Sequence, residues 1–145
     1  MTMNTATEVL QSSQPHVNGE RLWQSLMELA QLGATVKGGV CRLALTDLDR
    51  QARDLFVRWC EEAGCTVTVD GVGNIFARRP GRNAALAPVM TGSHIDTQPT
   101  GGKFDGCFGV LAGVEVLRTL NDLGGQTVHH IHMHVLGQRP VSYTH

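Results

Sequence analysis

The sequence has no apolar run near the ~20 residues that a membrane-spanning helix requires, so we expect no transmembrane segment. The first eight residues, Met-Thr-Met-Asn-Thr-Ala-Thr-Glu, contain neither the basic nor the apolar region of a secretory signal. There is no block of basic residues, and the formal net charge is −1. These absences argue against both a membrane and a nucleic acid as partners.

The four cysteines form no Cys-x-x-Cys pair and match no zinc-knuckle spacing. We therefore expect free or buried thiols in a reducing compartment, which predicts a cytoplasmic protein. Only 17% of the residues are charged and 41% are hydrophobic, a composition that favours a packed core over disorder. The 145 residues provide material for one domain.

Three helices are predicted from periodicity and capping residues. Asn18 is a suitable N-cap for a helix whose leucines recur every three or four residues until Gly33. Thr46 caps a second helix with an apolar stripe, and Gly64 fits the left-handed position after its end. A third apolar stripe predicts a helix over residues 106–122.

Strands are predicted where the hydrophobic period changes. Alternating residues at 65–69 and 74–78 indicate a hairpin, and an apolar run over 88–92 indicates a buried strand. This order of elements predicts an α/β domain with a mixed sheet. The expected organisation is a disordered lead (1–17), the domain itself (18–126) and a histidine-rich tail (127–145).

Chemically active side chains are concentrated after the last of these strands. Residues 92–96 read Gly-Ser-His-Ile-Asp, and Asp105 follows in a glycine-rich loop. Open α/β sheets bind ligands at such a strand end, and imidazole with carboxylate suits zinc or manganese better than magnesium or calcium. One member of the His94–Asp96 pair can bind a metal while the other orients it. Asp105 can bridge two metals from the start of the next helix.

The same residues also have structural interpretations. His94 can be a core histidine with a satisfied ring, and Asp96 and Asp105 can be turn or cap residues. Their grouping at one strand end favours the functional interpretation. Cys107 has no partner histidine identifiable from the sequence, which favours a buried thiol over a nucleophile. Glu115 lies away from the apolar stripe of its helix, so we expect it on the surface.

A family resemblance is carried by residues 92–106, Gly-Ser-His-Ile-Asp-Thr-Gln-Pro-Thr-Gly-Gly-Lys-Phe-Asp-Gly, with Gly-Val-Leu-Ala-Gly at 109–113. They resemble the hydantoinase/carbamoylase group of the M20 metallopeptidase clan. The group contains N-carbamoyl-L-amino-acid hydrolases, bacterial-type beta-ureidopropionases and allantoate amidohydrolases. Residues 38–46 and 73–78 resemble it too, so the likeness covers roughly residues 19–124.

The resemblance implies a zinc-peptidase-like fold and a binuclear amidohydrolase that cleaves the carbamoyl C–N bond of N-carbamoyl-L-amino acids or related ureido acids. The histidine matching His94 binds one metal, the aspartate matching Asp105 bridges both, and the aspartate matching Asp96 orients the histidine. The implied cofactors are two divalent ions, Zn2+ or Mn2+, with Co2+ or Ni2+ as further options. The implied partner is a small ureido substrate, with a homodimer for the full-length form. A cis peptide at Asp105–Gly106 is a further implied feature.

The chain departs from the group after its third predicted helix. Members continue into an apolar strand, glutamates that supply the general base and a metal ligand, and a lid domain. Here residues 127–145 follow instead, and no base is assigned. We expect the chain to be an N-terminal fragment, inactive alone, with a non-native tail; a genuine metal-binding histidine tail is the alternative. A dipeptidase or aminoacylase of the same clan and a non-catalytic metal-binding fragment remain alternative functions.

Overall fold

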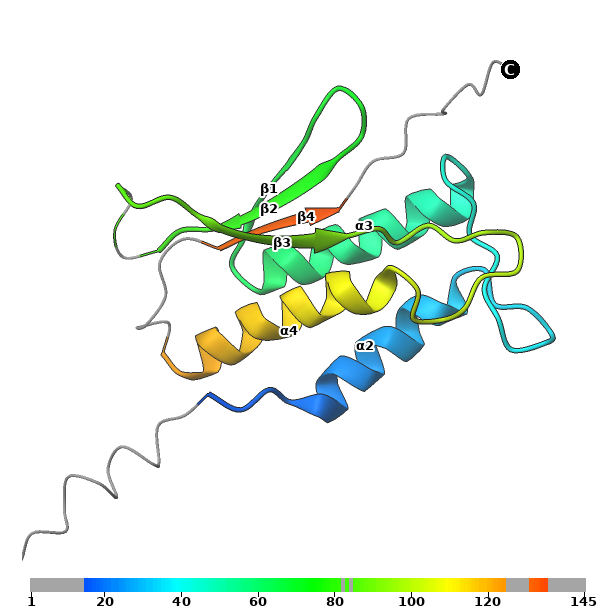
Figure 1. Ribbon diagram of the computed structural model, residues 1–145, viewed down its shortest axis with the longest axis horizontal. Coiled ribbons are helices and arrows are strands. Elements are labelled where there is room, and N and C mark those ends of the chain that lie inside the picture. The colour runs from blue at the N-terminus through cyan, green and yellow to red at the C-terminus, as the bar shows by residue number, and fades with distance from the viewer. Residues whose placement is uncertain (1–14, 82, 84, 125–130, 136–145) are drawn as a thin grey trace, which may run out of the picture.

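The computed structural model describes residues 15–81, 83, 85–124 and 131–135. The four strands of this part form one mixed sheet in the order β1-β2-β4-β3. The helices lie together on one side of it (Figure 1), where α4 packs against β3 and β4, α3 against β1, and α2 against α4. The predicted α/β class is confirmed. The elements are α2 (Gly19–Gln31), α3 (Asp47–Glu62), β1 (Thr66–Val69), β2 (Ile75–Arg79), β3 (Val89–Ser93), α4 (Cys107–Asp122) and β4 (Ile131–Val135).

Local signals set the helix ends. The Asn18 side chain accepts a hydrogen bond from the backbone N–H of Arg21 at 3.0 Å. The Thr46 hydroxyl accepts one from the N–H of Asp49 at 3.3 Å. Each contact satisfies an N–H group that has no partner within its helix. After α3, Gly64 has a φ of +80°, the left-handed conformation predicted for it.

The strand pairings combine both directions. β1 and β2 form the predicted antiparallel hairpin, with Val69 opposite Ile75. β4 lies between β2 and β3, antiparallel to the first and parallel to the second. Strand β4 belongs to the segment 127–145, which the sequence analysis separated as a tail. It occupies an inner position of the sheet. The rest of that segment lies outside the described residues, as do residues 1–14, so its foreign origin stays a prediction.

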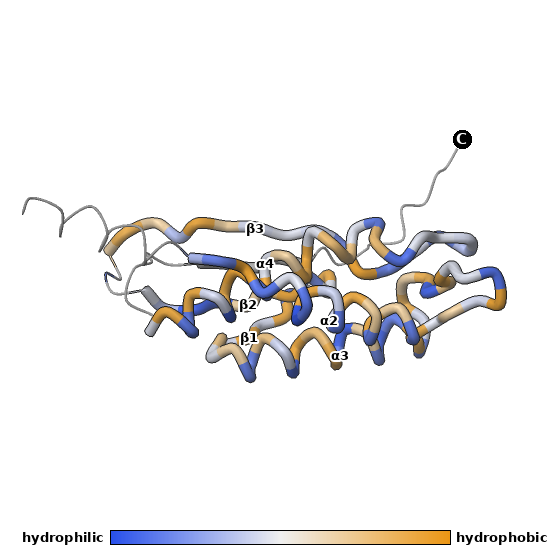
Figure 2. Tube along the Cα trace, turned by 90° about the horizontal axis from the view of Figure 1, so that it is seen from below, coloured by the Kyte–Doolittle hydropathy of each residue, from blue (hydrophilic) through white to orange (hydrophobic). Residues whose placement is uncertain are grey.

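The expectation of a buried strand before the site is wrong for this chain. Val89 is 63% exposed and Met90 is 56% exposed, although both belong to an apolar run. β3 is an edge strand of the described sheet (Figure 2). Its position leaves Val89 and Met90 open to solvent. No helix within the described ranges is long and apolar enough to cross a membrane.

The core lies between the helices and the sheet face that they cover. Ala77 of β2 and Ile95 after β3 are buried, as is most of the α4 stripe. Burying a large aliphatic or aromatic side chain contributes about 1.5–3 kcal/mol, so these contacts supply most of the stabilisation. The largest fully buried apolar side chains are Phe56, Leu29, Ile75, Ile95, Leu111 and Leu117.

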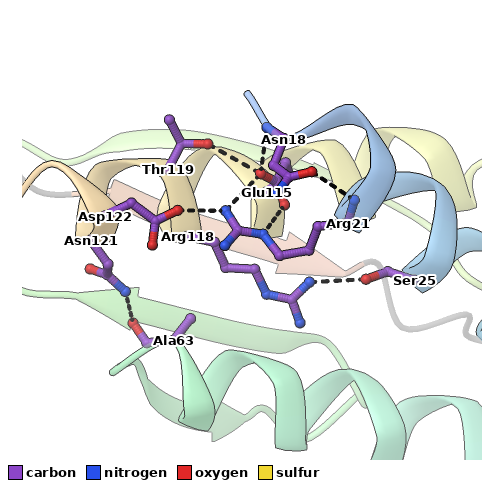
Figure 3. A network of polar contacts seen from close by, with 9 residues as sticks. All are labelled: Asn18, Arg21, Ser25, Ala63, Glu115, Arg118, Thr119, Asn121 and Asp122. Atoms are coloured by element: carbon purple, nitrogen blue, oxygen red, sulfur yellow. Dashed lines mark hydrogen bonds and ion pairs between the residues drawn. The ribbon is translucent and has the colours of Figure 1, made fainter. Parts of the chain in front are cut away.

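Glu115 corrects the sequence analysis, which placed it on the surface. It is 1% exposed, and its carboxylate accepts hydrogen bonds from Arg21 Nε at 2.9 Å and from Arg21 Nη2 at 2.8 Å (Figure 3). The N–H of Asn18 and the hydroxyl of Thr119 complete its partners. Burial by itself raises the pKa of this carboxyl, but these donors and the Arg21 charge outweigh it, and the net pKa lies below the ordinary value. The pair fixes the start of α2 to α4.

Candidate metal-binding site

His94 and Asp96 come together where the chain leaves β3. The intervening Ile95 side chain is buried in the core, so its two neighbours project to the opposite side of the extended backbone. His94 Nδ1 lies 3.2 Å from Asp96 Oδ1 and 3.1 Å from the Asp96 backbone oxygen. Both oxygens near Nδ1 are hydrogen-bond acceptors. In the neutral tautomer of the imidazole that fits them, the proton is therefore on Nδ1. The lone pair then resides on Nε2, the nitrogen a metal would need.

Gly106 lies against the other edge of the imidazole. A Cβ placed on it would stand 2.5 Å from His94 Nε2 and 2.4 Å from His94 Cε1. Its φ is +69°, so both the conformation and the available space require glycine. The loop before α4 thereby approaches the side of His94 that Asp96 leaves free.

Asp105 precedes this glycine and is exposed at the start of α4. Its backbone oxygen accepts a hydrogen bond from the N–H of Cys107 at 2.7 Å. The Asp105–Gly106 peptide is trans, because none of the described peptide bonds is cis, so the implied cis bond is wrong for this structure.

The described residues do not complete a metal centre. Within the described ranges, no group of three or more histidine, cysteine, aspartate or glutamate side chains is close enough to hold an ion. The structure pairs His94 with Asp96 and brings the Asp105–Gly106 backbone to the same place.

The loop after Asp96 is tied to the segment that follows α2. The N–H of Arg42 donates to the Thr97 hydroxyl at 2.7 Å, and that hydroxyl lies 3.1 Å from the Val40 oxygen. Val40 and Gly101 exchange two backbone hydrogen bonds, of 2.9 and 3.0 Å. The loop is therefore anchored at both its start and its end.

Cys107 is a buried thiol, as predicted. Burial raises its pKa, and the nearby Arg42 guanidinium offsets that effect only in part. The sequence analysis missed Arg42 itself, which is 1% exposed and contacts the Cys107 sulfur at 3.2 Å. The available signal was an arginine inside the otherwise apolar stretch at 40–45.

Comparison with known proteins finds relatives of this chain. The N-carbamoyl-L-amino-acid amidohydrolase of Rhizobium meliloti is 56% identical over 115 residues, which are 79% of this chain and 28% of that protein. A crystal structure of an amidase of the hydantoinase/carbamoylase family from Burkholderia multivorans is 63% identical with a TM-score of 0.83, covering 87% of this chain and 31% of that one. This chain is a homologue of the hydantoinase/carbamoylase amidases.

Other relatives of this chain have different names. The allantoate amidohydrolase of Bacillus subtilis is 40% identical over 97 residues, which are 67% of this chain and 24% of that protein. The chain spans less than a third of the length of these relatives. No family model matches the chain.

Proposed function

We propose that this chain supplies part of the active site of a metal-dependent amidohydrolase acting on N-carbamoyl-L-amino acids. The observation that carries the proposal is the His94–Asp96 pair, with the Gly106 backbone against the free edge of the imidazole. The 56% identity to an N-carbamoyl-L-amino-acid amidohydrolase favours this substrate class over the other ureido acids.

The residues at the strand end fit a divalent metal. An imidazole held through Nδ1, and the exposed carboxylate of Asp105 in the residue before Gly106, are ligand types that suit Zn2+ or Mn2+. We propose His94 and Asp105 as ligands, Asp105 being the one that would be shared between two ions. Bound divalent ions would supply a nucleophile from water at neutral pH and polarise the substrate carbonyl.

The protein's own contribution is to orient the imidazole. Asp96 holds the His94 ring through Nδ1, which fixes both its rotation and its tautomer. Because residue 106 is glycine, it places no side chain of its own against Nε2. We assign the general base to none of the described residues, and we propose that the 145 residues alone do not turn over substrate.

A hybrid enzyme tests the proposal. Residues 15–124 would replace the matching segment of the Rhizobium meliloti relative, with His94→Ala in a second hybrid as the control. We expect the first hybrid to release ammonia from N-carbamoyl-L-amino acids, and the second to lose at least ~100-fold in kcat/KM. A folded first hybrid that hydrolyses dipeptides instead would support the peptidase alternative. A folded hybrid with neither activity would refute the proposal.

A further inference from the structure

Arg42 places a positive charge inside the protein without an acidic partner. The residue is 1% exposed, and it makes no ion pair with a carboxylate in the part of the chain that the structure describes. Burying a charge is costly unless hydrogen bonds satisfy it. The partners here are neutral: Arg42 Nε donates to the Ile95 oxygen at 2.8 Å, Nη1 to the Leu29 and Leu32 oxygens at 3.0 and 2.6 Å, and Nη2 to the Cys107 sulfur at 3.2 Å.

Two of these partners explain how the charge is accommodated. Leu29 is in the last turn of α2 and Leu32 is its C-cap, so their carbonyl groups belong to the negative end of the helix dipole. A cation is favoured at this end, where the Leu29 oxygen accepts the N–H of Leu32 at 3.2 Å as well as the guanidinium. The end of α2 is thus a fixed support for the guanidinium.

The other two partners are the neighbours of the candidate metal ligands. Ile95 stands between His94 and Asp96, and its carbonyl belongs to the peptide that joins it to Asp96, so the hydrogen bond from Arg42 fixes the backbone between the two side chains. Cys107 is the first residue of α4 and follows Asp105 by two positions. One rigid planar group therefore contacts the backbone of the strand exit and the start of α4 at the same time.

We propose that Arg42 is a positioning residue for the metal site: it sets the separation between His94 after β3 and Asp105 before α4, using the end of α2 as its support. This inference rests on the proposed function. Arg42 acts through Ile95 and Cys107 and touches no reacting group. The role requires arginine, because its planar fork presents donors in several fixed directions, whereas lysine offers one compact ammonium.

Zinc affinity of the full 145-residue chain tests the inference. Zn2+ would be titrated against a chromophoric chelator for wild type, Arg42→Lys and Arg21→Lys, with His94→Ala defining binding outside the site. Urea unfolding of the same samples would measure stability. Arg21→Lys is the matched control, since Arg21 also joins α2 to α4 but does so at Glu115 and Asp122. We expect Arg42→Lys to weaken His94-dependent zinc binding by about 10- to 100-fold and Arg21→Lys by less than about 3-fold.

The outcomes separate the inference from the proposed function. Equal zinc affinity in wild type and Arg42→Lys would overturn the positioning role, even if the variant is less stable, because a purely structural arginine changes stability alone. A wild type without His94-dependent zinc binding would overturn the proposed metal site and the inference with it.

A measurement on the wild type covers the case in which Arg42→Lys does not fold. The Arg42 Nε–H resonance should exchange slowly with solvent and shift when Zn2+ binds, whereas the Arg21 Nε–H resonance should not shift. Zinc binding that leaves the Arg42 signal unchanged would overturn the inference.

Discussion

Replacing Glu115 with glutamine removes the buried negative charge that joins α2 to α4. The variant keeps the shape of the side chain but turns one charge-accepting oxygen into an N–H donor that faces the Arg21 guanidinium. Arg21 Nε and Nη2 now approach the carboxylate at 2.9 and 2.8 Å, and the Asn18 N–H lies at 3.0 Å (Figure 3). We expect a lower free energy of unfolding and little change in fold.

The magnitude follows from the exposure of the two partners. Breaking a fully buried ion pair costs about 3–5 kcal/mol, because the remaining charge has no solvent. The Arg21 side chain is 29% exposed, so water can hydrate part of the charge that the substitution leaves behind. We therefore expect a loss of about 2 kcal/mol, equivalent to about a 30-fold decrease in the folding equilibrium constant.

The effect of pH has a definite sign. The pKa of Glu115 is lowered in the folded state, so its ionised form stabilises the fold. This stabilisation is fully present above the ordinary glutamate pKa of about 4.3 and is lost as the pH falls through the lower folded-state value. The difference between wild type and Glu115→Gln should therefore be constant from about pH 5 upward and should shrink in more acidic solution.

Urea unfolding followed by circular dichroism measures both quantities. Asp122→Asn is the control, because Asp122 contacts the same Arg21 nitrogen at 2.9 Å but its side chain is 61% exposed. An exposed pair contributes about 0–1 kcal/mol, so this variant should lose less than about 0.5 kcal/mol. Similar losses in the two variants, or a Glu115→Gln effect that does not depend on pH, would refute the role assigned to burial.

Three further predictions concern the site loop, the thiols and the sheet edge. Gly106→Ala should cost about 3 kcal/mol or more because its Cβ would meet His94, whereas Gly64→Ala, with positive φ but open space, should cost about 1 kcal/mol in the same unfolding assay. Cys41 is partly exposed and should react with a thiol reagent in the native protein, whereas Cys107 should react only in urea; early reaction of Cys107 would contradict its burial. Met90→Lys should reduce light scattering from concentrated protein without loss of stability, because β3 presents apolar side chains to water.

Much of the fold was predictable because its signals are local. The caps at Asn18 and Thr46, the glycine after α3 and the alternation in the hairpin all act within a few residues of the chain. The candidate site was found in the same way, since a histidine and an aspartate two positions apart share a side of an extended segment. Gly106, which leaves room for the imidazole, is also part of the sequence motif at residues 92–106.

The errors arose where a residue's surroundings come from distant segments. The helical pattern of α4 identified one apolar stripe, but α4 contacts α2 as well as the sheet, so Glu115 is buried on a second face. Its partner Arg21 is 94 residues away in sequence. β3 reads as a buried strand, yet its exposure depends on what lies beside it in the sheet.

The sequence by itself determined the helices, the hairpin and the succession of His94, Asp96 and Asp105 after a strand, because caps, glycines and periodicity act over short stretches of chain. Only the tertiary structure decided that Glu115 is a buried anion and Arg42 a buried cation. The Arg42 guanidinium bonds to carbonyl groups 10, 13 and 53 residues away and to a sulfur 65 residues away. A buried charge is stable only where such partners meet, and packing, not local pattern, brings them together.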